Sequence, residues 1–140
     1  MPPPDLTEAA TARMLAAARA AQRRAHAPYS RFLVGAAVLD ELGRVHAGCN
    51  VENAAYPLGM CAEAVAIAAM VLAGGRTVGA MVVVGDGEAL VTPCGGCRQR
   101  LREFAAPDTP VIVADRDAIR ARYTLAQLLP ESFGPENLER

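Results

Sequence analysis

Residues 61–84 read CAEAVAIAAMVLAGGRTVGAMVVV and contain a helix pattern followed by a strand pattern. Residues 61–73 are almost wholly apolar and are followed by Gly74-Gly75, which predicts a helix that is buried all round and ends at the glycines. Residues 78–84 form a continuous apolar run, typical of a central strand covered on both faces. A buried helix next to a central strand indicates an α/β protein.

The segments on either side continue this alternation of helices and strands. Upstream, Asp5 is expected to cap a helix that reaches about residue 25, with Glu8 completing a capping box. The remaining expected elements are strands at 34–39, 45–51 and 111–114, a helix at 94–104, and one more short strand with a helical turn within 123–129. This order predicts a three-layer α/β/α sandwich with a mixed, roughly five-stranded sheet.

The composition limits the classes of protein and of partner. A chain of 140 residues with 52% hydrophobic content is expected to form one domain, residues 1–140, around a single core. A net charge of −1 and the lack of a run of basic residues argue against nucleic acid as a partner. No apolar stretch is long enough to span a membrane, and the first residues lack the pattern of a secretory signal. We therefore expect a cytoplasmic protein without a membrane partner.

Three cysteines and one glutamate form a split pattern. Cys61-Ala62-Glu63 begins one expected helix, and Cys94 and Cys97 lie at the start of another. Each helix follows a strand, so both starts can meet at one edge of the sheet, and helix N-termini favour thiolates. Three thiolates can hold Zn²⁺ and leave its fourth position open for water. Glu63 is then a candidate catalytic proton shuttle.

Three other interpretations of these residues stay open at this point. Cys94 and Cys97 could form a redox dithiol. A structural zinc site could take His26, His46 or Cys49 as its fourth ligand, in a zinc-binding module without enzymatic activity. Glu63 could serve only to complement the dipole of its helix, although a carboxylate in an otherwise apolar helix is expected to be partly buried for a reason.

Four motifs follow one another along the chain: Pro28-Tyr29-Ser30-Arg31-Phe32, Gly48-Cys49-Asn50-Val51-Glu52-Asn53, Cys61-Ala62-Glu63 and Pro93-Cys94-Gly95-Gly96-Cys97-Arg98-Gln99, with Leu128-Leu129-Pro130 before Phe133. In this order they resemble the small homotetrameric cytidine deaminases. The resemblance covers residues 28–133. It implies zinc-dependent deamination of cytidine and 2′-deoxycytidine in pyrimidine salvage, with zinc on Cys61, Cys94 and Cys97 and with Glu63 moving the protons.

The same resemblance implies roles for residues that would bind the nucleoside. Asn50 and Glu52, which share a face at the end of a strand, would bind the ribose hydroxyls. Phe32 would lie beside the pyrimidine, and the backbone around Ala62 and Thr92 would hydrogen-bond the base. Tyr56 would lie near a subunit junction and Phe133 would enter a neighbouring subunit's site, in a homotetramer with shared active sites.

One position departs from the pattern of the resemblance. Many members carry an arginine directly after the catalytic glutamate, and this chain has Ala64 there. Three thiolates and Zn²⁺ carry a formal charge of −1, which weakens the acidity of the metal. Arg98, beside Cys97, is the expected replacement, through a hydrogen bond to a ligand sulfur.

Two other substrates are compatible with the metal motif. An aminonucleoside such as blasticidin S is the alternative within zinc deamination, and the Asn50–Asn53 segment and Tyr56 argue against it. A cytosine within RNA or DNA is disfavoured by the neutral charge and the short chain.

Overall fold

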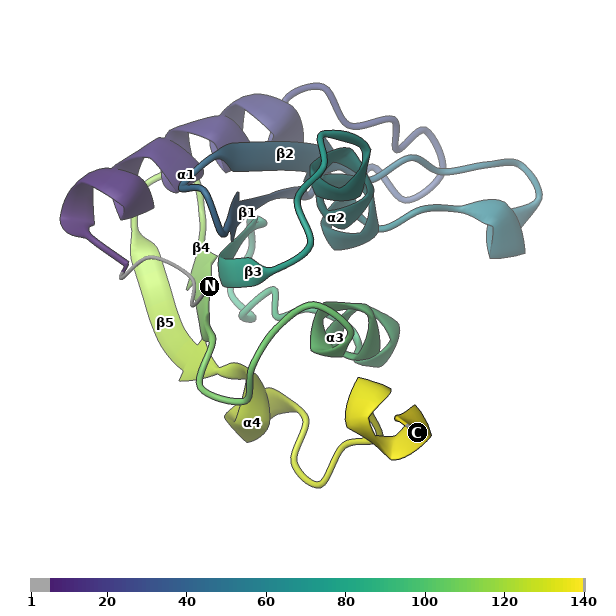
Figure 1. The fold of residues 1–140 in the computed structure, drawn as a ribbon. Coiled ribbons are helices and arrows are strands. Elements are labelled where there is room, and N and C mark those ends of the chain that lie inside the picture. Colours follow the sequence, from purple (N-terminus) through teal and green to yellow (C-terminus); the bar gives the residue numbers. More distant parts are fainter. Residues whose placement is uncertain (1–5, 140) are drawn as a thin grey trace.

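The computed structural model describes residues 6–139 (Figure 1). Its helices are α1 (Glu8–Gln22), α2 (Ala62–Leu72), α3 (Gly95–Arg102) and α4 (Leu125–Leu128), with 3-10 turns at Tyr56–Leu58 and Pro135–Leu138. Its strands are β1 (Gly35–Asp40), β2 (Val45–Cys49), β3 (Val78–Val84), β4 (Pro110–Ala114) and β5 (Ile119–Thr124).

The five strands form one mixed sheet in the order β2-β1-β3-β4-β5. β1 is antiparallel to β2 and to β3, β3 is parallel to β4, and β4 is antiparallel to β5. β3 is the central strand, and all of its residues are buried, as its continuous apolar sequence requires. The predicted mixed five-stranded sheet is confirmed.

Each face of the sheet packs against its own layer of helices. Met14 and Ala18 of α1 pack on one face, against a cluster that includes Val82 of β3. The other face is covered by α2 and α3, which contribute residues such as Met70 and Leu101. Figure 1 shows α2 and α3 together on the side of the sheet opposite α1. The three-layer α/β/α arrangement is therefore confirmed.

Strand direction brings the starts of α2 and α3 to the same edge of the sheet. Because β2 and β3 are both antiparallel to β1, they run in the same direction and their carboxyl ends lie at one edge. The chain leaves β2 toward α2 and leaves β3 toward α3. Gly48 in β2 permits close packing of α2, because a Cβ atom there would lie 2.4 Å from the backbone nitrogen of Ala66.

Three expectations about the elements differ from the structure. Asp5 lies outside the described residues, and the N-cap of α1 is Thr7, whose hydroxyl accepts a hydrogen bond from the Ala10 amide. β5 begins at Ile119, four residues before the expected strand, because its alternation of apolar and charged residues fits a half-exposed edge. α2 is not buried all round, since Leu72 is 91% exposed. Within residues 6–139, no helix has the length and apolarity needed to cross a membrane.

Candidate active site

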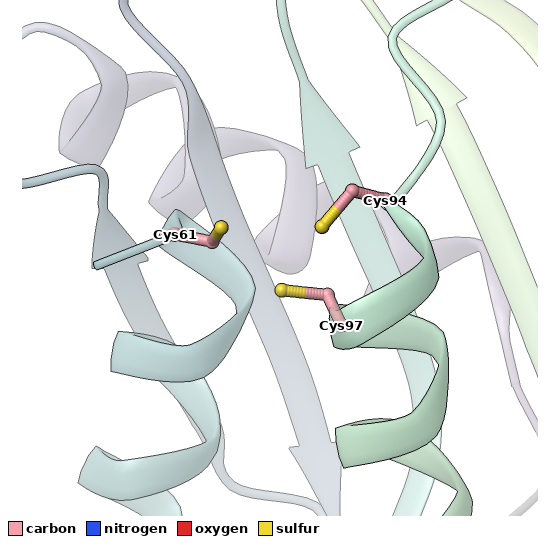
Figure 2. Close-up of side chains that lie close together, drawn as sticks. All are labelled: Cys61, Cys94 and Cys97. Carbon is pink, nitrogen blue, oxygen red and sulfur yellow. The ribbon is translucent and has the colours of Figure 1, made fainter. Parts of the chain in front are cut away.

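The three cysteines of the split pattern converge between the starts of α2 and α3. Cys61 is the N-cap of α2, Cys94 is the N-cap of α3, and Cys97 follows one turn into α3. Figure 2 shows the three thiols pointing toward one another from the two helices. Their Sγ atoms all lie within 4.8 Å of one another. The three side chains are positioned to bind a single metal ion.

The donor set fits zinc and leaves one position open. A tetrahedral zinc ion takes thiolate ligands at about 2.3 Å, so sulfurs grouped this closely can share one ion after small adjustments. Among residues 6–139, the group contains these three cysteines and no fourth His, Cys, Asp or Glu. His46 instead lies 2.8 Å from an oxygen of Asp40. The expected open zinc site is thus supported over a structural site completed by His26, His46 or Cys49.

The protein environment shifts the pKa values of the three cysteines in different directions. Burial raises the pKa of the Cys97 thiol, and the nearby Glu63 carboxylate raises it further. Burial also raises the pKa of Cys61, whereas the backbone N–H of Cys97 lowers the pKa of Cys94. Bringing three thiolates next to a carboxylate is unfavourable without a cation, so this cluster suits a divalent metal.

Glu63 lies in the first turn of α2 and is only 5% exposed. Burial raises the pKa of its carboxyl, and its own backbone N–H and the charge of Arg100 lower the pKa in part. The side chain lines the same cavity as Cys61 and Cys94. A buried carboxyl with a raised pKa next to a metal cluster is suited to accept a proton and return it.

A cavity of about 380 Å³ lies in front of the cluster, and its volume is within the usual range for small-molecule sites. It brings together most of the residues that are predicted to form the site. Its lining includes Asn50, Glu52, Tyr56, Cys61, Ala62, Glu63, Thr92 and Cys94. Three predicted residues, Cys97, Phe32 and Phe133, are not among its lining residues. Phe32 borders an adjoining hollow that shares Val91 and Thr92 with the cavity.

Asn50 and Glu52 hold the segment that carries Phe32. The Asn50 side chain accepts a hydrogen bond from the Val34 amide at 2.9 Å and donates one to the Phe32 carbonyl at 2.8 Å. The Glu52 carboxylate accepts hydrogen bonds from the Tyr29 and Ser30 amides and from the Ser30 hydroxyl. The Ser30 hydroxyl is the main cause that lowers the pKa of Glu52, so the carboxylate is ionised near neutral pH.

The two aromatic residues expected at subunit junctions are exposed in the single chain. Tyr56 is 74% exposed and Phe133 is 59% exposed. The Tyr56 ring contacts Tyr29 at a centroid distance of 5.6 Å, and the Phe133 carbonyl accepts a hydrogen bond from Gln99 on α3. Both rings therefore remain largely uncovered by this chain.

The expectation that Arg98 contacts a ligand sulfur is wrong. Its guanidinium donates to the Pro93 and Leu128 carbonyls and to the Thr92 hydroxyl, so it ties the loop before α3 to the C-terminal region. Arg100 occupies the expected place, with Nη1 at 3.5 Å from the Cys97 sulfur. The sequence contained an indication of this, because residues three apart in a helix share a face and adjacent residues do not.

Comparison with known proteins agrees with this geometry. The family model described as the cytidine and deoxycytidylate deaminase zinc-binding region matches residues 8–113. The cytidine deaminase of Sporosarcina psychrophila is 41% identical over 126 residues, which cover 90% of this chain and 93% of that protein. A cytidine deaminase of Mycobacterium tuberculosis is 42% identical over 116 residues, 83% of this chain and 84% of that protein.

Solved structures show the same similarity in three dimensions. The crystal structure of cytidine deaminase from Burkholderia pseudomallei superposes with a TM-score of 0.81 at 40% identity, covering 91% of this chain and all of that chain (100%). The fold, the cysteine cluster and the sequence similarity together show that this chain belongs to the cytidine and deoxycytidylate deaminase family.

Proposed function

We propose that this protein catalyses the hydrolytic deamination of cytidine and 2′-deoxycytidine to uridine and 2′-deoxyuridine, with release of ammonia. The observation that carries the proposal is the position of Glu63 beside an open three-cysteine cluster, in a cavity of nucleoside size. Relatives at about 40% identity that are named cytidine deaminases support the same reaction over that of a blasticidin S deaminase.

Cys61, Cys94 and Cys97 would hold the zinc ion as thiolates. Zinc bound there supplies one contribution, which is to bring the pKa of a water molecule toward neutrality. Glu63 would take a proton from the attacking water as the water adds to C4 of the cytosine ring, and would deliver this proton to N3. The same carboxylate would then take the remaining proton from the new C4 hydroxyl and give it to the departing amine, so that one water is consumed, ammonia leaves and Glu63 ends as the carboxylate it was at the start.

Asn50 and Glu52 would orient the nucleoside through its ribose hydroxyls. An amide side chain offers two N–H donors and a carbonyl oxygen that can accept twice, so after its two hydrogen bonds to the loop Asn50 keeps one donor and one acceptor position. The Glu52 carboxylate likewise has acceptor capacity beyond its three bonds. Phe32 would pack beside the pyrimidine, and the backbone at Ala62 and Thr92 would hydrogen-bond the base.

We also propose a homotetramer in which Tyr56 and Phe133 lie at subunit junctions. The support is their exposure and the exposed apolar face of α2, where Leu72 is 91% exposed. Exposed aromatic and aliphatic groups of this size are typical of protein–protein contacts. We place the enzyme in cytoplasmic pyrimidine salvage, where a reducing environment would keep its four cysteines as free thiols.

The reaction is tested by following the loss of cytidine absorbance as uridine forms, with purified protein of measured zinc content. The Glu63→Gln variant should retain zinc and lose turnover by several orders of magnitude, because it keeps the shape of the side chain and removes the proton acceptor. Glu103→Gln, on an exposed glutamate at the end of α3, is the matched control and should be fully active. Turnover by Glu63→Gln at the wild-type rate would contradict the proposed role.

A further inference from the structure

α3 carries three arginines after Cys97, and each has different partners. Arg98 binds the Pro93 and Leu128 carbonyls and the Thr92 hydroxyl. Arg102 binds the Ser132 hydroxyl and is ion-paired with Glu136. Arg100 alone among the three directs a donor to a ligand-type sulfur, with Nη1 at 3.5 Å from Cys97 Sγ.

We propose that Arg100 is a positioning residue that offsets the negative charge of the cysteine cluster through its contact with the Cys97 sulfur. The contact spans one helical turn, because residues three apart lie on the same face of α3. Gly96 leaves space for it, since a Cβ atom at that position would lie 3.3 Å from Arg100 Nη1. The residue after Glu63, which could have faced the cluster from α2, is Ala64 and carries no charge.

Metal binding changes the charge of the site, and Arg100 is expected to strengthen zinc binding for this reason. Three neutral thiols that bind Zn²⁺ release three protons, so the site passes from a charge of zero to a charge of −1. A fixed cation at the sulfur favours the negatively charged, zinc-bound site. A hydrogen bond from a guanidinium to the sulfur also lowers the electron density that the sulfur donates to the metal. Arg100 therefore strengthens zinc retention and tunes the metal without touching the substrate.

This inference rests on the proposed zinc site, and its test does not depend on turnover. Zinc affinity is measured by competition with a chromophoric chelator, and the sulfur-to-metal charge-transfer band is recorded after replacement of zinc by Co²⁺. The variants are Arg100→Met, which removes the charge at similar length, and Arg100→Lys, which keeps the charge. Arg122→Met, on an exposed arginine of the edge strand β5, is the charge-matched control.

Arg100→Met should bind zinc about tenfold more weakly, as expected for the loss of one partly exposed charge near the metal. Its Co²⁺ band should move to longer wavelength, because the sulfur loses a hydrogen bond. Arg100→Lys should recover most of the affinity, and Arg122→Met should match the wild type. Thermal unfolding of the metal-free proteins should be unchanged, because the Arg100 side chain is exposed.

The proposal is overturned if Arg100→Met keeps wild-type affinity and an unshifted band, or if Arg100→Lys is as weak as Arg100→Met. It is also overturned if Arg122→Met loses as much affinity as Arg100→Met. A wild-type protein that binds zinc but does not convert cytidine would contradict the proposed reaction and leave these metal measurements valid. The two proposals therefore fail through different observations.

Discussion

Asn50 and Glu52 show how single polar side chains can position a loop and still face a cavity. Their hydrogen bonds fix the backbone from Tyr29 to Val34, and with it the place of Phe32. Both residues also line the cavity in front of the cysteines. Sequence pattern could select these residues by type and spacing, but it could not show that the same atoms hold the loop, because that depends on contacts across about 20 residues.

Substitution of Glu52 should separate the ribose contact from the support of the loop. If the carboxylate binds a ribose hydroxyl, Glu52→Gln should lower kcat/KM for cytidine by about ten- to a hundredfold, the usual range for a hydrogen bond to a charged group. Activity on 1-methylcytosine, which has no ribose, should change much less. Steady-state kinetics on the two substrates measure the difference.

Ser30→Ala is the matched control for this prediction. It removes one hydrogen bond to the Glu52 carboxylate and leaves the carboxylate in place. A loss of activity that comes only from displacement of the loop should affect cytidine and 1-methylcytosine alike in both variants. Equal losses on the two substrates in Glu52→Gln would therefore exclude the ribose contact.

Asp40 should make stability depend on pH in the acidic range. Burial raises the pKa of its carboxyl, but hydrogen bonds from His46 and Arg44 outweigh burial and lower the pKa from 3.8 to about 2. A pKa that is lower in the folded state stabilises the fold above pH 4, and the contribution is lost as the pH falls toward 2. Asp40→Asn should cost about 2 kcal/mol at pH 7.

Urea unfolding of wild type and Asp40→Asn at several pH values tests this. The difference in the free energy of unfolding should be constant above about pH 5 and should shrink as the pH falls from about 4 to 2. The comparison isolates Asp40, because other carboxylates with lowered pKa, such as Asp115, are the same in both proteins. A difference that stays constant down to pH 2 would contradict the assigned role.

At the scale of elements, the sequence predicts most reliably where one physical cause dominates. β3 was predicted with its observed bounds because a continuous apolar run has one stable location, the middle of the sheet. The predicted start of β5 lies too late in the sequence, because an edge strand with alternating arginines differs little from a loop in composition. The cysteine cluster could be predicted from type and spacing, whereas the choice of Arg100 over Arg98 required the actual side-chain directions.

The packing of α2 on β2 should be disturbed by any side chain at position Gly48. A methyl group there would lie 2.5 Å from the Ala62 carbonyl oxygen and 2.4 Å from the Ala66 nitrogen, so the helix backbone would have to move. Because Cys61 and Glu63 begin this helix, Gly48→Ala should destabilise the fold by about 3 kcal/mol and also weaken zinc binding. Urea unfolding and metal analysis measure the two effects.

Gly95→Ala is the control for Gly48→Ala, since a Cβ atom there has no neighbour within 4 Å in the described structure. It should retain full stability, because alanine is favoured over glycine in a helix. Wild-type stability for Gly48→Ala would show that α2 can shift freely against the sheet. The position of α2 would then not explain the geometry of the cluster.

At the scale of the whole molecule, the single chain leaves apolar side chains uncovered on and near the site elements. Leu72 at the end of α2, Tyr56 and Phe133 are all more than half exposed. Leu72 belongs to the face of α2 that this chain leaves exposed, whereas Ala66 and Met70 lie on its buried face. The exposed apolar face of α2 would be buried if another subunit packs against it, as in the proposed homotetramer.

Subunit mixing tests whether Phe133 completes the site of a neighbouring chain. Glu63→Gln lacks the proton acceptor, and Phe133→Ala lacks the exposed ring, so each variant alone should have little activity. If Phe133 acts in trans, some sites in a mixed tetramer combine an intact Glu63 with an intact Phe133, about a quarter of all sites after random exchange in equal amounts. The activity of the mixture should then rise well above the mean activity of the two variants. Light scattering should give a mass of four chains. If Phe133 acts within its own chain, or if the protein is monomeric, no mixed site is complete. The activity of the mixture would then equal the mean of the two variants and would contradict the shared active site.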